Sequence, residues 1–377
     1  MHLKNILSIA FLFISYQQLM GQNAAREHGV TFGLMKTGKS NSITDVNGVK
    51  VGHFTKIIGD HIRTGVTAIL PHDGNLFQEK VPAAVFVGNG FGKLAGSTQI
   101  EELGNMESPI VLTNTLAVAS GIQGIIAYTL NQAGNEAVQS VNAVVGETND
   151  GYLNDIRGQH ISKEEVLEAI INASTEPVKE GNVGAGTGTV CFGFKGGIGS
   201  SSRELPDKFG GFTVGVLVQS NFGGVLQIDG VPIGKLLEQY SFRDQLESAD
   251  GSCMIVVATD APVSERNLKR MAQRAMMGLA KTGGIASNGS GDYVIAFSTN
   301  ESNRIPHSNS PLSLEEKKVL RNDDMSPLFL AVIEATEEAI INSLFAANDM
   351  SGKNGRTIRS LPKKEVLEIL KNHNRIH

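Results

Sequence analysis

The chain has 377 residues, of which 41% are hydrophobic and 19% charged, and its formal net charge is −5. This is the composition of a globular protein, and the length suits one large domain or two ordinary ones. The mild acidity, and the lack of any lysine or arginine run longer than a pair, argue against a nucleic-acid-binding surface.

The first 21 residues have the pattern of a secretory signal peptide. Lys4 precedes an apolar run, residues 6–14, that is too short to span a bilayer as a stable helix, and the small residue Gly21 suits cleavage. No polar face repeats at helical spacing, which disfavours an amphipathic start of the mature fold. No cysteine adjoins the cut, so no lipid anchor is indicated. We therefore expect a periplasmic or secreted protein without membrane contact after signal removal.

Several segments before residue 250 have patterns of regular structure. Apolar residues alternate around Asn47-Gly48 in the stretch Ile43–His53, which predicts a hairpin. The acidic run 235–248 is helix-like. Periodicity predicts further strands at 67–70, 83–87, 141–147 and 213–219, and helices at 122–137 and 163–173.

Behind residue 252 the pattern becomes strand, helix, strand, helix. Met254–Ala258 is an unbroken run of strand formers, typical of a strand buried on both faces. Ser264 is a good N-cap for an apolar helical stripe that closes at Gly283-Gly284. A strand at 293–297 and a helix at 326–347 follow. Long helices flanking apolar strands predict sheets covered by helices in one compact α/β or α+β body, without a composition break between domains.

Two glycine-rich stretches resemble nucleotide-binding loops but fail on detail. Gly90–Ala95 fits a loose dinucleotide fingerprint, yet the next strand ends at Asn114 without the acid that would hold a ribose. Gly188–Lys195 has phenylalanine where a phosphate loop needs glycine before the lysine. We interpret both as turns. The histidines and cysteines show no metal-binding spacing, so no metal and no cofactor is predicted.

The two cysteines, Cys191 and Cys253, lie in apolar, strand-like runs. Export makes a disulfide feasible, but the runs favour small buried side chains. Cys253 adjoins Ser252, and successive side chains of a strand point to opposite faces, so the two residues cannot share one role.

Two serines stand at the roots of predicted strands. Ser252 follows Gly251, and a hydroxyl in such a place could cut its own chain, although these residues alone favour a plain tight turn. Ser290 lies two residues after Asn288, where a nucleophile elbow needs glycine, and a strand rather than a helix follows it. A hydroxyl beside Asp292 could relay protons, although a turn with an aspartate cap is the simpler interpretation.

Five motifs follow one another along the chain in a recognisable order. They are Ile43–His53, Gly184–Gly188, Phe194–Gly199, Asp250–Pro262 and Glu334–Ile340. Together they resemble the DmpA/BapA family of self-processing N-terminal aminopeptidases. The resemblance extends from about Gly38 to about Gly355, almost the whole mature chain.

The resemblance implies an α+β fold, a four-layer α-β-β-α sandwich like that of N-terminal nucleophile hydrolases but differently connected. It also implies a single catalytic domain, residues 22–377, that is cut at the Gly251-Ser252 bond into chains 22–251 and 252–377. Homo-oligomers of such processed heterodimers, ring-like or tetrahedral, are expected.

The same resemblance assigns candidate catalytic residues. Ser252 falls at the nucleophile, Ser290 at a second catalytic serine, and Asn221 at an asparagine that helps to hold the oxyanion. Asp292 stands where the family commonly has glutamate, so its reach is shorter. The α-amine that the cut frees on Ser252 has a reference pKa of about 8 and can serve as the base.

Two further positions concern the substrate. Glu147 matches an acid suited to binding a free amino group, and Asn149 lies where some members have an aromatic residue. The implied substrates are short peptides or aminoacyl amides and esters, with β- and D-amino acids among the candidates.

Two alternatives stay open. Acyl transfer, as in the similarly folded ornithine acetyltransferases, is disfavoured because those enzymes use threonine and because this chain has an export signal. A non-catalytic periplasmic binding protein on the same fold is disfavoured by the retention of Ser252, Ser290 and Asp292.

Overall fold

The computed structural model describes residues 25–243, 251–307, 312, 314 and 316–376. The predicted signal peptide and the end of the acidic run before Gly251 lie outside the described residues. Within the described part, no helix is both long enough and apolar enough to cross a membrane.

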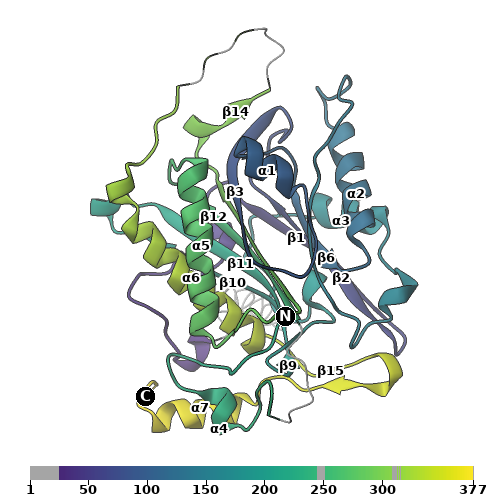
Figure 1. Ribbon diagram of the computed structural model, residues 1–377, viewed down its shortest axis with the longest axis vertical. Coiled ribbons are helices and arrows are strands. Elements are labelled where there is room, and N and C mark those ends of the chain that lie inside the picture. The colour runs from purple at the N-terminus through teal and green to yellow at the C-terminus, as the bar shows by residue number, and fades with distance from the viewer. Residues whose placement is uncertain (1–24, 244–250, 308–311, 313, 315, 377) are drawn as a thin grey trace, which may run out of the picture.

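The strands form two main sheets, one large and one small (Figure 1). The large sheet has the order β10 (Gly197–Glu204), β11 (Thr213–Asn221), β12 (Gly251–Thr259), β13 (Ser290–Ser298), β3 (Glu79–Gly90) and β14 (Ile305–Pro306), and β5 (Asn105–Met106) also pairs with β3. The small sheet has the order β1 (Lys50–Ile58), β2 (Ile62–Leu70), β6 (Ile110–Asn114), β7 (Val144–Thr148) and β4 (Leu94–Ala95). The pairs β12–β13 and β6–β7 are parallel, and the other pairs of these sheets are antiparallel.

Helices cover the outer faces of both sheets. In Figure 1, α5 (Glu265–Lys281) and α6 (Ser326–Phe345) lie on one side of the strands, and α2 (Val118–Leu130) and α3 (Lys163–Ile171) on the other. The smaller elements are α1 (Ser97–Leu103), α4 (Ile233–Leu236), α7 (Lys363–Asn372), the pair β8 (Val190–Cys191) and β9 (Phe194–Lys195), and the pair β15 (Met350–Ser351) and β16 (Thr357–Ile358).

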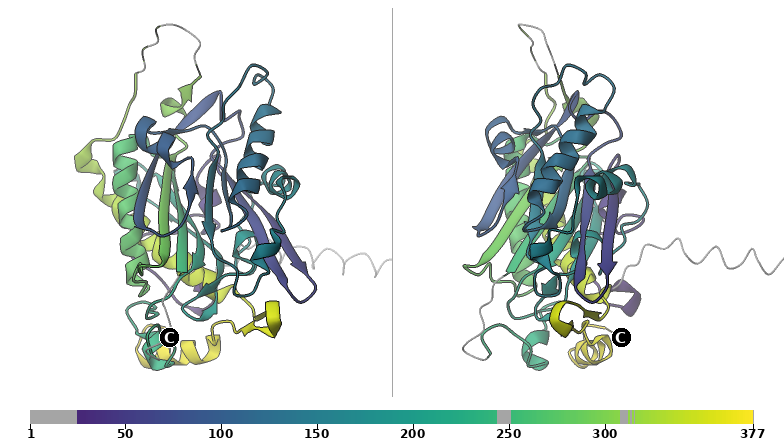
Figure 2. Two further views of the ribbon diagram at one scale, coloured as in Figure 1. Left: turned by 45° about the vertical axis from the view of Figure 1, so that its right-hand side comes forward. Right: turned by 90° about the vertical axis from the view of Figure 1, so that its right-hand side faces the viewer.

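Three hydrophobic clusters define four layers. One cluster packs α5 and α6 on the large sheet, a second fills the space between the sheets, and a third packs α2 and α3 on the small sheet. Strand β12 belongs to two of them: Cys253 faces the helices and Met254 faces the other sheet. This double burial explains why the sequence of β12 is apolar without alternation. The predicted α-β-β-α sandwich is confirmed, and Figure 2 shows the layers from two further sides.

The structure corrects two local predictions. The hairpin predicted at Asn47-Gly48 is wrong, because Ile43–Asp45 forms a 3₁₀ helix and β1 pairs with β2 across a later turn. The Ile43 N–H is bonded to the Ser200 hydroxyl of the large sheet at 2.8 Å, a long-range contact that local periodicity cannot reveal. The helix predicted at 122–137 begins at Val118 and ends at Leu130. The N-cap at Ser264 is confirmed.

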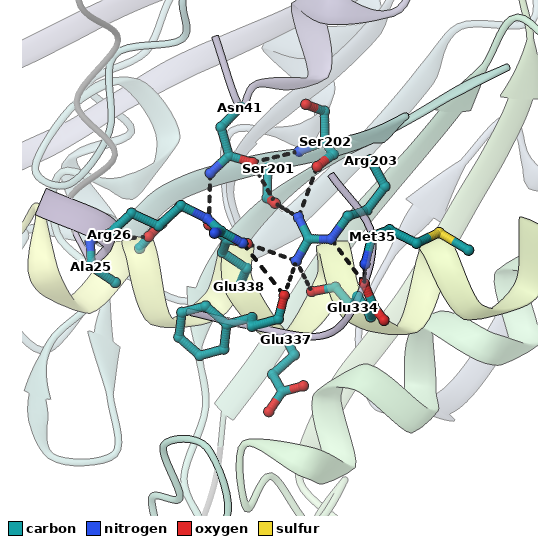
Figure 3. A network of polar contacts seen from close by, with 12 residues as sticks. Ala25, Arg26, Met35, Asn41, Ser201, Ser202, Arg203, Glu334, Glu337 and Glu338 are labelled. Atoms are coloured by element: carbon teal, nitrogen blue, oxygen red, sulfur yellow. Dashed lines mark hydrogen bonds and ion pairs between the residues drawn. The ribbon is translucent and has the colours of Figure 1, made fainter. Parts of the chain in front are cut away.

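A buried ionic network attaches the N-terminal segment to the core (Figure 3). The guanidinium of Arg203, on β10, is fully buried and donates to Glu334 at 3.1 Å and to Glu338 at 2.7 Å, both on α6. Arg26 and Asn41, from the N-terminal segment, also donate to Glu338, at 2.7 and 2.6 Å. Residues 25–41 are thereby held against α6 and β10.

Candidate active site

Three neighbouring strands of the large sheet bring the predicted catalytic segment together. Asn221 is the last residue of β11, Ser252 the second of β12, and Gly291 the second of β13. The registers pair Ser252 with Asn221 on one side and with Gly291 on the other. Residues far apart in sequence thus meet where these three inner strands of the sheet begin or end.

The Ser252 hydroxyl lies beside the peptide bond that precedes it. It donates to the Gly251 carbonyl oxygen at 2.6 Å and accepts from the Gly291 N–H at 3.3 Å. The side chain is buried. Gly251 is required sterically, because a β-carbon there would lie 2.6 Å from both the Asn221 carbonyl oxygen and Cα of Phe222. The tight fit fixes the Gly251 carbonyl within reach of the hydroxyl.

Asn221 presents its amide group as a donor. Its Oδ1 accepts from the Val190 N–H at 2.9 Å, which leaves Nδ2 available to donate. Because directly paired residues of adjacent strands share a face, the Asn221 side chain lies on the face of Ser252. A donor so placed is suited to stabilise the oxyanion that forms on a carbonyl group attacked by that hydroxyl.

Ser290 and Asp292 lie on the opposite face of the sheet. Ser290 pairs with Gly251 and Asp292 with Cys253, whose side chain packs toward α5 and α6, and side chains alternate along a strand. The Ser290 hydroxyl donates to Asp292 Oδ1 at 2.8 Å. This pair therefore flanks the backbone of Ser252, where its α-amine would lie after a cut, rather than its hydroxyl.

The Asp292 carboxylate is incompletely paired. Its Oδ2 is buried without a hydrogen-bond partner in the described structure. Burial raises the pKa of Asp292 to about 6, although the Ser290 hydroxyl and a backbone N–H at Cys253 oppose the shift. Such a carboxyl changes protonation near neutral pH, as acid-base groups of active sites do.

Glu147 lies at the end of β7 in the small sheet, and three donors converge on it. Its Oε1 accepts from the Lys93 backbone N–H at 3.0 Å and from Lys93 Nζ at 3.3 Å, and its Oε2 accepts from the Thr115 hydroxyl. The Glu147 side chain is only 3% exposed. This carboxylate is held in one orientation.

The connection from β3 to β4 links Glu147 to the serine site. It leaves the large sheet at Gly90 and enters the small sheet at Leu94. A β-carbon on Gly92 would lie 3.2 Å from Glu147 Oε1 and 3.4 Å from Cα of Gly291, the residue whose N–H contacts Ser252. Position 92 is thus close both to the Glu147 carboxylate and to Gly291, the residue that contacts Ser252.

Gly92, Lys93 and Thr115 were not predicted as site residues. The glycine-rich stretch Gly90–Ala95 stands out in the sequence, but its pattern predicts only a turn. The position of this stretch between the two sheets depends on the tertiary fold, which local sequence does not show. The one feature of the sequence that could have indicated a site here is the cluster of glycines at the end of a strand.

Asn149 is not brought into the cluster. Its side chain is exposed, and its Oδ1 accepts from the Gly151 N–H at 2.9 Å, within its own loop. Within the described residues, the structure shows no contact that joins Asn149 to Ser252 or Glu147.

Both cysteines are free and buried. Burial raises the pKa of Cys191 to about 12 and raises the pKa of Cys253 well above its ordinary range. Cys253 faces the helix-side core, away from the Ser252 hydroxyl. Neither thiol is suited to act as a nucleophile, since the thiolate is the reactive form.

The fold and site are those of a hydrolase, and comparison with known proteins identifies the family. The family model described as peptidase family S58 matches residues 41–358. The β-peptidyl aminopeptidase BapA of Sphingosinicella microcystinivorans is 40% identical over 374 residues, which cover 93% of each chain.

Two solved structures are also similar. A β-aminopeptidase of Burkholderia sp. is 40% identical, with a TM-score of 0.85, over 92% of this chain and 98% of that one. The L-aminopeptidase D-Ala-esterase/amidase of Ochrobactrum anthropi, described as a prototype for the serine aminopeptidases and a variant of the Ntn hydrolase fold, is 35% identical, with a TM-score of 0.86, over 94% and 99%. The chain therefore belongs to peptidase family S58, and it is an aminopeptidase.

Proposed function

We propose that this protein is an exported aminopeptidase that cuts its own chain at the Gly251-Ser252 bond and then uses Ser252 as its nucleophile. The observation that carries the proposal is the Ser252 hydroxyl at 2.6 Å from the Gly251 carbonyl oxygen, opposite the Asn221 side chain. The hydroxyl lies next to the bond that it would break.

In the self-cleavage step, Oγ of Ser252 attacks the carbonyl carbon of Gly251. The hydroxyl proton passes to the Ser252 nitrogen as the C–N bond breaks, which gives an ester between Gly251 and the Ser252 side chain. Water hydrolyses that ester. The products are a carboxylate on Gly251 and a free α-amine on Ser252.

In turnover, the freed α-amine takes the proton of the Ser252 hydroxyl, which attacks the substrate carbonyl. Nδ2 of Asn221 donates to the developing oxyanion, and one well-placed donor of this kind contributes about 3 kcal/mol. Ser290 and Asp292 flank the amine and orient it. The amine then protonates the leaving group, and water releases the acyl group from Ser252.

Glu147 would bind the ammonium group of the substrate, which restricts the enzyme to substrates with a free N-terminus. One relative is named a β-peptidyl aminopeptidase, and another is named an L-aminopeptidase and D-Ala-esterase/amidase. We propose short peptides, amides or esters with an N-terminal β-, L- or D-amino acid, of which the β-aminoacyl class has the support of the BapA relatives.

A panel of β-, L- and D-aminoacyl nitroanilides, with N-acetylated counterparts, tests this proposal. Wild type should hydrolyse only the free-amine members, and Glu147→Gln should raise KM for them about tenfold or more, because a charge-assisted contact is lost. Equal hydrolysis of the N-acetylated members would contradict amine recognition. The same panel with amine acceptors distinguishes acyl transfer from hydrolysis.

Export, domain organisation and assembly belong to the same proposal. We expect a mature enzyme that begins near residue 22, folds as one catalytic domain of two chains, and assembles as a homo-oligomer of heterodimers. N-terminal sequencing of protein from the periplasm and the mass of the native assembly test these points.

A further inference from the structure

The carboxylate proposed to receive the substrate ammonium already holds one. Nζ of Lys93 lies 3.3 Å from Oε1 of Glu147. Glu147 is 3% exposed and Lys93 is 53% exposed, so the lysine side chain is the partner with freedom to move. An ammonium on a flexible stem is chemically similar to the N-terminus of a substrate.

The other two donors to Glu147 are fixed in place. The Lys93 N–H belongs to the backbone of the β3–β4 connection, and the Thr115 hydroxyl donates from a residue directly after β6. A substrate ammonium that approaches Glu147 can therefore replace only one of the three donors, the Lys93 Nζ.

We propose that Lys93 is a specificity-determining residue, a placeholder cation on Glu147 that the substrate ammonium must displace. This inference rests on the proposed role of Glu147 in amine recognition. Lys93 neutralises the buried carboxylate in the empty site and whenever a substrate without an amine occupies it. Without Lys93, an amine-less substrate would leave a buried carboxylate without its cation, which is costly.

Two effects on kinetics follow. Displacing Lys93 costs part of the binding energy of every free-amine substrate, so the lysine raises KM. Lys93 also lowers the discrimination against amine-less substrates. Because the lysine is half exposed, the effect on KM is modest, about threefold, in the range of a partly exposed ion pair.

The test compares Lys93→Met with wild type on a free-amine aminoacyl nitroanilide and its des-amino analogue. For the free-amine substrate we expect KM to fall about threefold, with the change in KM rather than in kcat. The ratio of kcat/KM between the two substrates should rise by at least the same factor. Butylammonium ion, a simple competitor for the carboxylate, should inhibit Lys93→Met more strongly than wild type.

Two variants serve as controls. Lys93→Arg keeps a cation and should retain the wild-type KM and selectivity. Lys36→Met removes the lysine of an exposed ion pair with Glu204 on β10 and should behave as wild type. A thermal midpoint measured for each variant confirms folding.

An unchanged or higher KM in Lys93→Met, with Glu147→Gln still raising KM, overturns the placeholder role and leaves the proposed function standing. An unchanged KM in Glu147→Gln overturns both, because the carboxylate then does not bind the substrate amine.

Discussion

Two of the sites at which the large sheet carries buried polar groups differ in how completely those groups are paired. Around Arg203, beneath α6, the guanidinium donates to two carboxylates, to the Ser201 hydroxyl at 2.9 Å and to the Ser202 carbonyl at 2.7 Å (Figure 3). Beside Ser252, at one end of the central strands, Asp292 has one buried oxygen without a hydrogen-bond partner among the described residues, and burial raises its pKa to about 6.

The difference separates a structural site from a chemical one. A buried charge with all its hydrogen bonds satisfied fixes the fold and has no capacity left for a ligand. A buried hydroxyl next to a carbonyl, and a carboxyl with a free oxygen, retain that capacity at some cost in stability. Substitutions at the first site should therefore affect stability, and substitutions at the second should affect activity.

Ser252→Ala should have the largest effect. Without the hydroxyl, neither self-cleavage nor acyl-enzyme formation is available, so we expect one uncut chain and a loss of activity of at least about a thousandfold. Gel electrophoresis and a nitroanilide assay measure both. The neighbouring variant Cys253→Ala, on the opposite face, should be cut and active. Processing of Ser252→Ala would refute the assignment.

Arg203→Met should reverse the pattern. Glu334 would remain buried without a cation and Glu338 would keep only Arg26, and breaking a buried pair in this way typically costs about 3–5 kcal/mol of the free energy of unfolding. Urea unfolding measures the loss, and activity per folded molecule should be retained. Arg359→Met, at an ion pair whose arginine is 80% exposed, should leave the unfolding midpoint unchanged. An equally small effect at Arg203 would remove the contrast between the two sites.

Asp292→Asn should lower kcat/KM by about a hundredfold, because the proposed base, the α-amine of Ser252, would lose the carboxylate that orients it. The acid limb of the pH profile of kcat/KM should also move to lower pH. The substitution removes a carboxyl whose pKa is about 6, and it removes an anion that raises the pKa of the Ser252 amine by favouring its ammonium form. A pH profile of kcat/KM for both proteins tests this. An acid limb at the same pH in both proteins would show that Asp292 does not contribute to the pH dependence of kcat/KM.

Stability should respond to Asp292 in a defined direction. Because burial raises its pKa from the ordinary range near 4 to about 6, the folded protein holds the proton more tightly than the unfolded chain. This tighter proton binding adds to the free energy of unfolding below pH 4, and the added stability is lost as the pH rises through about 6. Asp292→Asn, which is neutral at every pH, should therefore lack this loss.

Gly92→Ala should have the smallest effect of the four. The added methyl would lie 3.2 Å from both Glu147 Oε1 and the Tyr293 ring, and 3.4 Å from Cα of Gly291. We expect KM to rise about tenfold with little change in folding, since a 1.4 kcal/mol clash corresponds to that factor. Gly90→Ala is the matched control, because its β-carbon would meet only Val87, at 3.7 Å.

The sequence predicted those features that depend on local patterns. The apolar run Met254–Ala258 identified β12, and Ser264 identified the start of α5, because burial on both faces and capping leave direct traces in sequence. The roles of Ser252, Ser290 and Asn221 are implied only by the family resemblance, and the structure places those residues on adjacent strands.

Other features depended on contacts between distant segments. The hairpin predicted at Asn47-Gly48 is wrong because the Ile43 N–H donates to the Ser200 hydroxyl on a distant strand. Lys93 reaches Glu147 across 54 positions, and no local pattern shows that this lysine, among all those of the chain, faces a buried carboxylate. The burial of Arg203 cannot be predicted from local sequence either, because its partners Glu334 and Glu338 lie on a distant helix.

Intact mass spectrometry of the purified wild-type protein tests the central claim most directly. If Ser252 cuts the bond before it and becomes the nucleophile, two chains will appear, one that ends at Gly251 and one that begins at Ser252. A single unbroken chain that hydrolyses aminoacyl nitroanilides would contradict the claim, because no free α-amine would then exist on Ser252 to act as its base.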